Sequence, residues 1–209
     1  MNKKIIVICI VSLIVLTTFS QKQNYIRGGG NIDLSFPNAG FGIGGNIDLR
    51  YNIFDNLNAG IKIGSMYSAS NVSYNDTEYT GGLTASMINY YLLHSDYYFN
   101  YGRSIFAPFV GAGLGLYKIS NLKLQVDETP QFSELLNLSR NNKFGALIRT
   151  GIEISWFRIA LEYNLIPRSD LMGLDDNLIP PAIKVVGTTP NSYFTITTGF
   201  YIGGGKWGK

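Results

Sequence analysis

The sequence predicts an all-β protein, an eight-stranded antiparallel up-and-down transmembrane β-barrel. Three observations lead to this prediction: apolar residues at every second position, an N-terminal export segment, and connections that alternate between short and long. The period of two is clearest over residues 39–51, where Phe41, Ile43, Ile47 and Leu49 alternate with small or charged residues. Such a strand has one apolar and one polar face. Its length matches the roughly 9 to 11 tilted residues that cross a bilayer.

The first 20 residues have the three parts of a secretory signal peptide. A lysine pair precedes an uncharged run over residues 5–19, and a small-x-small pattern ends at Ser20. We expect cleavage near Ser20 rather than an uncleaved anchor, because the run is shorter than the roughly 20 apolar residues of a spanning helix. The remaining chain, residues 21–209, is predicted to be the barrel domain. It contains no cysteine, since the only one, Cys9, lies inside the apolar run.

Composition supports a membrane barrel and argues against nucleic acid as a partner. Without Lys3 and Lys4 the chain has 15 basic and 14 acidic residues, so its net charge falls from +3 to +1, and no basic patch is present. Charged residues make up only 15%, whereas soluble domains have about a quarter. The 24 glycines and 13% aromatic residues suit a sheet with lipid outside and aromatic girdles at its ends.

Eight segments have the alternation of a strand. They are residues 25–36, 39–51, 57–67, 83–99, 108–117, 144–156, 157–165 and 192–203. The facing of residues 83–99 stays open, because the adjacent tyrosine pairs at 90–91 and 97–98 interrupt the alternation. Within the barrel, Gly111, Gly113 and Gly115 are expected to line a crowded interior.

The connections predict the orientation of the barrel. After the first hairpin they alternate between short turns and long segments, and the long ones are residues 68–82, 118–143 and 167–191. Outer-membrane barrels have tight periplasmic turns and long outer loops, so these three segments should face outward. Residues 132–138 are compatible with a short helix. Because it holds Pro180, Pro181 and Pro190, the segment 167–191 is predicted to contain no regular strand.

Nine charged residues fall on the inward side of the predicted strands. They are Arg27, Asp33, Asp48, Arg50, Lys62, Arg149, Glu153, Arg158 and Glu162. Buried charges must be paired or solvated, and eight strands leave an interior barely wide enough for side chains. We therefore expect a salt-bridged plug, with a conducting, charge-selective pore as the alternative. Pairing through the turn at residues 155–158 should place Arg149 level with Glu162 or Asn164, and Glu153 near Arg158.

No residue pattern predicts catalysis, a cofactor or a metal. His94 is the only histidine and is followed by Ser95, but adjacent strand residues point to opposite faces. Asp96 shares the face of His94 and is only its neighbour in sequence. The run Asp175-Asp176-Asn177 lacks the spacing of a calcium loop. The two glycine triplets have no phosphate-loop context.

Three segments, residues 108–117, 151–153 and 160–164, resemble the small outer-membrane β-barrel families of Gram-negative bacteria. The likeness is to OmpX-like, OmpA-transmembrane-like and OmpW-like proteins and covers essentially the whole chain after the signal. This resemblance implies an eight-stranded barrel with exposed loops and supplies no catalytic residue. Unlike these families, the chain does not end on a strand aromatic, so Phe200 or Trp207 is left to carry the signal for the barrel-assembly machinery.

The expected function is a cell-surface scaffold whose loops have structural, adhesive or binding roles. Its expected partners are outer-membrane lipid and lipopolysaccharide, the assembly machinery, and an extracellular ligand bound through the long loops. Three alternatives remain: a narrow porin-like channel for small or apolar solutes, a membrane enzyme that uses His94, and a soluble calycin-like barrel with its apolar face inward. The signal peptide, loop alternation and strand length favour the membrane.

Overall fold

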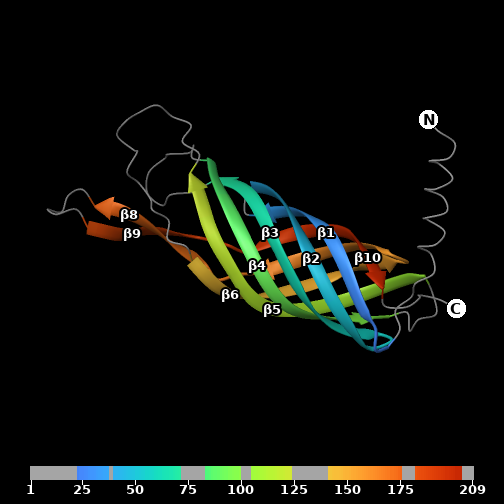
Figure 1. Cartoon of the computed structure of the whole chain (residues 1–209). Helices are drawn as coiled ribbons and strands as arrows, with labels where there is room; N and C mark the ends of the chain where they lie inside the picture. Colours follow the sequence, from blue (N-terminus) through green and yellow to red (C-terminus); the bar gives the residue numbers. More distant parts are fainter. Residues whose placement is uncertain are drawn as a thin grey trace, which may run out of the picture.

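Eight strands form a closed antiparallel barrel, as the sequence predicts (Figure 1). The computed structural model describes residues 23–37, 40–71, 83–99, 105–123, 141–175 and 182–203. The barrel strands are β1 (Ile26–Pro37), β2 (Gly40–Phe54), β3 (Leu57–Asn71), β4 (Leu83–Tyr98), β5 (Phe106–Lys123), β6 (Asn141–Ile154), β7 (Phe157–Leu165) and β10 (Tyr193–Gly203). Their order around the wall is β1-β10-β7-β6-β5-β4-β3-β2, and the β1–β10 pairing closes the barrel. The predicted signal peptide and the helix expected at residues 132–138 lie outside the described residues.

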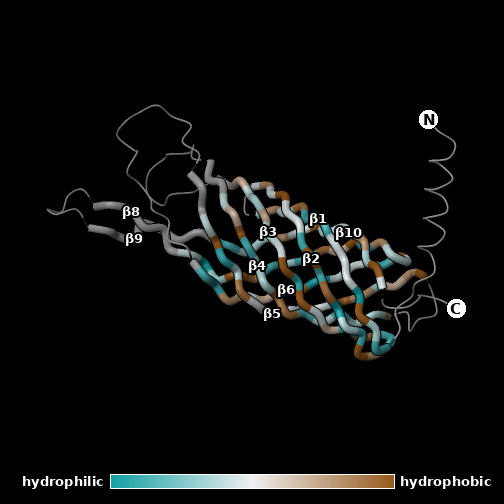
Figure 2. The backbone as a smooth tube through the Cα atoms, in the orientation of Figure 1, coloured by the Kyte–Doolittle hydropathy of each residue, from teal (hydrophilic) through white to brown (hydrophobic). Residues whose placement is uncertain are grey.

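The apolar face of each strand points outward. In β2, Ile47 and Leu49 are 65% and 54% exposed, whereas Asp48 and Arg50 between and after them are buried. Figure 2 shows this alternation of hydrophobic and hydrophilic residues along the barrel wall. The calycin-like alternative is therefore wrong, because it requires the apolar face inside. The described residues include no helix long and apolar enough to cross a membrane.

The structure settles the facing of β4. Tyr90 and Tyr98 are buried in the barrel, Tyr91 is exposed and Tyr97 half-buried, so the strand alternates without interruption. The tyrosine ring is apolar and its hydroxyl is polar, which suits the residue to either side of such a wall. That property made the sequence pattern ambiguous.

One prediction about residues 167–191 is wrong. Two strands, β8 (Ser169–Asp175) and β9 (Ala182–Thr189), form a separate antiparallel sheet that extends from one end of the barrel (Figure 1). Pro190 directly follows β9, and Pro180 and Pro181 fall between the two strands, outside the described residues. The prolines limit where the strands end but do not prevent them.

The wall has unequal height around its circumference. Strand β7 has 9 residues, whereas β3 has 15, β4 has 16 and β5 has 18. The longer strands occupy residues 68–71 of the first segment expected to be a loop, and residues 118–123 and 141–143 of the second. At the opposite end, two-residue turns join β2 to β3 and β6 to β7, and Ser155 in the second has a φ of 57°, as such hairpin turns favour.

Candidate functional site

The structure places all nine inward charges inside the barrel, none of them more than 3% exposed. It adds a tenth buried charge, Asp96; Lys143 also faces inward but is only half-buried. We call these ten residues the lumenal charge network. Five are basic and five acidic, so the charges of the network balance. They are Arg27, Arg50, Lys62, Arg149 and Arg158 against Asp33, Asp48, Asp96, Glu153 and Glu162.

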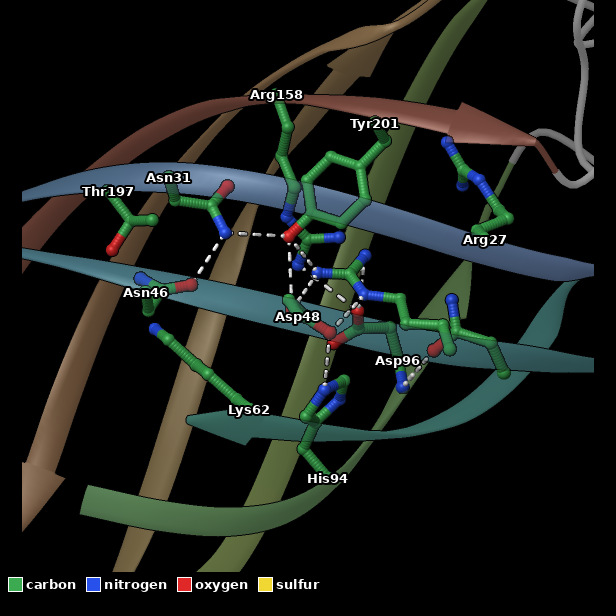
Figure 3. A network of polar contacts seen from close by, with 12 residues as sticks. Arg27, Asn31, Asn46, Asp48, Lys62, His94, Asp96, Arg158, Thr197 and Tyr201 are labelled. Atoms are coloured by element: carbon green, nitrogen blue, oxygen red, sulfur yellow. Dashed lines mark hydrogen bonds and ion pairs between the residues drawn. The ribbon is translucent and has the colours of Figure 1, made fainter. Parts of the chain in front are cut away.

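Asp96 lies where three guanidinium groups meet (Figure 3). Arg149 makes a bidentate contact, with Nε 2.7 Å from Oδ1 and Nη2 2.9 Å from Oδ2. Arg158 Nη2 and Arg50 Nη1 lie 3.1 and 3.2 Å from Oδ2. Strands β2, β6 and β7 are thus tied to β4 through one carboxylate, and the bidentate geometry is the strong form of this contact.

The sequence interpretation missed Asp96 as a network member. Its facing was left open with the rest of residues 83–99. Two signals in the sequence could have found it. His94 and Asp96 share a face, and the nine inward charges contain five cations but only four anions. A sealed interior needs a fifth anion, because an unpaired buried charge is strongly destabilising.

Ion pairs span the full width of the barrel, and the two shortest of them are Lys62–Glu162 and Arg149–Asp48. Strands β3 and β7 lie four positions apart in the ring of eight, as do β2 and β6, so each pair faces across the lumen. Lys62 Nζ on β3 lies 2.5 Å from Glu162 Oε2 on β7. Arg149 Nη1 on β6 lies 3.7 Å from Asp48 Oδ2 on β2. Side chains from opposite walls therefore meet at these two levels.

The end of the lumen near the short turns is filled by a second group of contacts. Glu153 pairs with Arg27 and accepts a hydrogen bond from the Tyr98 hydroxyl at 3.0 Å. The Arg158 guanidinium lies 3.5 Å from the centre of the Phe109 ring, a cation–π contact. The β6–β7 register places Glu153 opposite Arg158, as the sequence predicts.

The same register sets Arg149 opposite Glu162. This is one of the two pairings that the sequence predicted for Arg149, and the nearest atoms of the two side chains lie 3.6 Å apart.

His94 is a member of this packed interior. Its Nδ1 lies 2.6 Å from Arg149 Nη2, and its Nε2 lies 2.8 Å from Asp48 Oδ1. An arginine nitrogen can only donate, so Nδ1 accepts and Nε2 carries the proton that it donates to Asp48. Ser95 lies on the other face, where its hydroxyl donates to the Asn58 carbonyl at 2.6 Å. Histidine and serine are thus separated by the wall of the barrel.

The described residues contain no group of three His, Cys, Asp or Glu side chains placed to hold a metal. In the run Asp175-Asp176-Asn177, which lacks the spacing of a calcium loop, Asp175 is the last residue of β8. Asp176 and Asn177 lie outside the described part of the chain.

Inward glycines make room for the charged side chains. A Cβ on Gly111 would lie 2.0 Å from Asp96 Oδ1, and one on Gly60 would lie 2.9 Å from both Arg50 Cγ and His94 Cε1. The crowding expected at the glycines of β5 is contact with β4: with Asp96 at Gly111, with His94 at Gly113 and with Leu92 at Gly115. Long side chains on one strand therefore fit inside the lumen because the neighbouring strand has glycine at the facing positions.

Beyond the charges, toward the long loops, the lumen becomes apolar. A cluster of buried side chains fills this half: Met66, Ile88, Tyr90, Leu92, Tyr117, Ile119, Leu147, Ile166 and Tyr193. At its border with the charges lies a cavity of about 10 Å³, room for roughly one water molecule, lined by Asp33, Lys62 and Glu162 among others. Tyr90 joins the two halves, because its hydroxyl donates to Asp33 Oδ2 at 2.5 Å.

Comparison with solved structures tests this architecture. The outer membrane protein OprG from Pseudomonas aeruginosa aligns over 88% of this chain and 98% of its own, with a TM-score of 0.57 and 12% sequence identity. The chain has the fold of a small outer-membrane β-barrel. Since the identity is so low, this likeness establishes the fold alone.

Further matches to the barrel are weaker in geometry. Neisserial surface protein A aligns over 85% of this chain and 95% of its own, at 14% identity and a TM-score of 0.46. The N-terminal β-barrel domain of Pseudomonas aeruginosa OprF aligns over 87% and 100%, at 14% identity and a TM-score of 0.42. No protein-family model matches the barrel, and a search of curated proteins also gives no match.

Proposed function

We propose that this barrel is an outer-membrane scaffold with a plugged lumen, whose long connections carry structural, adhesive or binding roles at the cell surface. The observation that supports it most is the pair of ion pairs across the barrel's width, Lys62–Glu162 and Asp48–Arg149. An open pore needs a continuous water-filled path, and at these two levels side chains from opposite strands are in contact. The apolar cluster beyond the charges adds a second obstacle.

The outer surface supports residence in a bilayer. Exposed side chains such as Ile47, Leu93, Ile148 and Phe144 form an apolar wall that lipid would cover. In this setting the partners are outer-membrane lipid, lipopolysaccharide and the barrel-assembly machinery. The proposal assigns no catalytic step. Any extracellular ligand would be recognised by the segments between the strands.

Conductance across a planar bilayer tests the plug. We expect the refolded wild-type barrel to be silent. A variant with Lys62→Ala, Glu162→Ala and Leu147→Ala removes one side-chain pair across the lumen and one member of the apolar cluster, while keeping the charge balance. It should show brief current steps, because fewer contacts then close the lumen and the remaining pair, Asp48–Arg149 at 3.7 Å, is the looser of the two.

A matched control uses the neighbouring residues on the outward face. Ile61→Ala, Leu161→Ala and Ile148→Ala remove similar volume from the same strands without touching the lumen, so this variant should remain silent. Steady currents from the wild type would overturn the plug, and the narrow channel for small or apolar solutes would replace it.

A further inference from the structure

On the barrel strands whose side chains are described, the outward charged and carboxamide residues lie together, whereas hydroxyl residues such as Ser95 and Thr150 lie elsewhere on that face. Among barrel-strand residues whose side chains are described, Lys118 is the only charged residue on this face. The register places Lys118 directly opposite Asn89 on one neighbouring strand and Asn142 on the other. Asn89 in turn lies opposite Ser65. We call these four residues the outward polar row; they occupy consecutive strands β3 to β6.

On β4, β5 and β6 the row lies at the outer edge of the apolar wall, whereas on β3 the exposed Tyr67 lies beyond Ser65. On β4, β5 and β6 the outward residues are apolar or weakly polar over residues 91–99, 108–116 and 144–154. Each stretch has the roughly 9 to 11 residues that cross the hydrocarbon core. The next outward residue toward the long connections is Asn89, Lys118 or Asn142. These side chains therefore lie at the level of the lipid headgroups.

The opposite side of the barrel ends differently. At the same end, β1, β2, β7 and β10 carry the aromatic residues Phe36, Phe41, Tyr163 and Phe194. Those rings form the usual interfacial girdle. The β3–β6 side also carries outward rings, Tyr67, Tyr91 and Phe144, and differs from the other side by having the polar row beside them.

The chemistry of the row favours an anion. Lys118 and Asn142 are exposed, and the Lys118 ammonium lies 5.5 Å from the centre of the Tyr91 ring. The Ser65 hydroxyl donates to the Asn89 carboxamide oxygen at 2.6 Å, so the acceptor of Asn89 is engaged and its NH₂ group is the part left to contact a ligand. Ammonium and amide donors lie side by side, and the barrel strands whose side chains are described have no outward carboxylate. This arrangement is complementary to phosphate oxygens.

We propose that the outward polar row binds the phosphate of a phosphorylated lipid in the outer leaflet. Lys118 supplies the charge, and the two asparagines supply hydrogen bonds on either side of it. The site rests on the orientation given under the proposed function, with the long connections outward, but it does not depend on whether the lumen conducts.

The test is lipid binding by the full-length barrel after refolding in detergent, followed by native mass spectrometry. Lipid A carrying its phosphates is compared with the same lipid A after dephosphorylation. We expect the wild type to prefer the phosphorylated form and Lys118→Gln to bind it about fivefold more weakly, as expected for losing one lysine contact near a lipid surface. The dephosphorylated lipid should not distinguish the two proteins.

Lys143→Gln is the matched control. Lys143 lies on β6, close to the row, but on the inward side of the strand and half-buried. Its substitution should leave lipid binding unchanged. Equal binding by wild type and Lys118→Gln, or equal loss in both lysine variants, would overturn the site. Displacement of the lipid by millimolar inorganic phosphate would also overturn it, since the row would then hold a free anion rather than a lipid. Circular dichroism verifies that each variant is folded.

Discussion

The two faces of the same strands follow opposite rules about charge. On β6, Arg149 is 2% exposed and lies among carboxylates, whereas its neighbour Ile148 is 56% exposed on the outer wall. Inside, five cations are tolerated because five anions meet them. Outside, lipid offers no partner, and the described strands carry one charge, at the edge of the wall. In this barrel, charged side chains therefore lie where oppositely charged side chains can pair with them.

The largest expected effect comes from removing the shared partner inside. Asp96→Asn leaves Arg149, Arg158 and Arg50 around a neutral amide, with five buried cations against four anions. We expect a loss of about 3–5 kcal/mol in the free energy of unfolding, the usual cost of breaking a buried ion pair from one side. Urea unfolding of the refolded barrel, followed by tryptophan fluorescence, measures it.

The control for that variant is Asp55→Asn. Asp55 is an exposed residue of the β2–β3 turn that accepts one hydrogen bond from the Gln23 backbone at 2.9 Å. The same chemical change there should cost less than about 1 kcal/mol. Similar losses for both variants would contradict the central role of Asp96.

A double-mutant cycle on Lys62 and Glu162 tests whether pairing, and not charge itself, sets the rule inside. Lys62→Met alone leaves Glu162 without its contact at 2.5 Å and should destabilise the barrel by about 3 kcal/mol. Adding Glu162→Gln should restore a large part of this loss, since it removes a charge left with only its longer contact to Arg149, at 3.6 Å. Additive losses in the urea titrations would show that the two side chains act independently.

The sequence was sufficient for the wall and insufficient for parts of its contents. A strand buried on one face and lipid-covered on the other produces a strict alternation, so residues 39–51 and 144–156 revealed both strands and four of the nine inward charges. Asp96 was missed because tyrosine suits both faces and masked the alternation of β4. The partners across the lumen, such as Lys62 with Glu162, depend on barrel closure and strand stagger, and no local pattern encodes these.

The β8–β9 sheet marks another limit of local reasoning. The composition of residues 167–191 is dominated by its prolines, yet these restrict only the positions they occupy and their immediate neighbours. Strand formation over Ser169–Asp175 depends on pairing with a segment seven or more residues away.

On the outward face, the cost of a charge should depend on depth. Ile148→Lys introduces an ammonium in the middle of the apolar stretch of β6, whereas Asn142→Lys introduces one at its edge, beside Lys118. We expect losses of about 2–4 kcal/mol for the first and about 1 kcal/mol or less for the second. Unfolding in phosphatidylcholine vesicles gives both values, and equal losses would contradict the assignment of the row to the headgroup level.

The smallest expected effect compares the same added methyl group on the inward and outward faces of the barrel. An added methyl at Gly111 would lie 2.0 Å from Asp96 Oδ1 and 2.8 Å from the Ser95 carbonyl oxygen, so Gly111→Ala should cost about 1–3 kcal/mol through forced rearrangement. On the outward face, a methyl at Gly30 would meet nothing within 4 Å. Gly30→Ala should therefore be neutral or slightly stabilising, because alanine reduces the freedom of the unfolded chain. If the two alanine variants unfold at the same urea concentration, the lumen is less tightly packed around Asp96 than these contacts imply, and the arginines there would have room to separate.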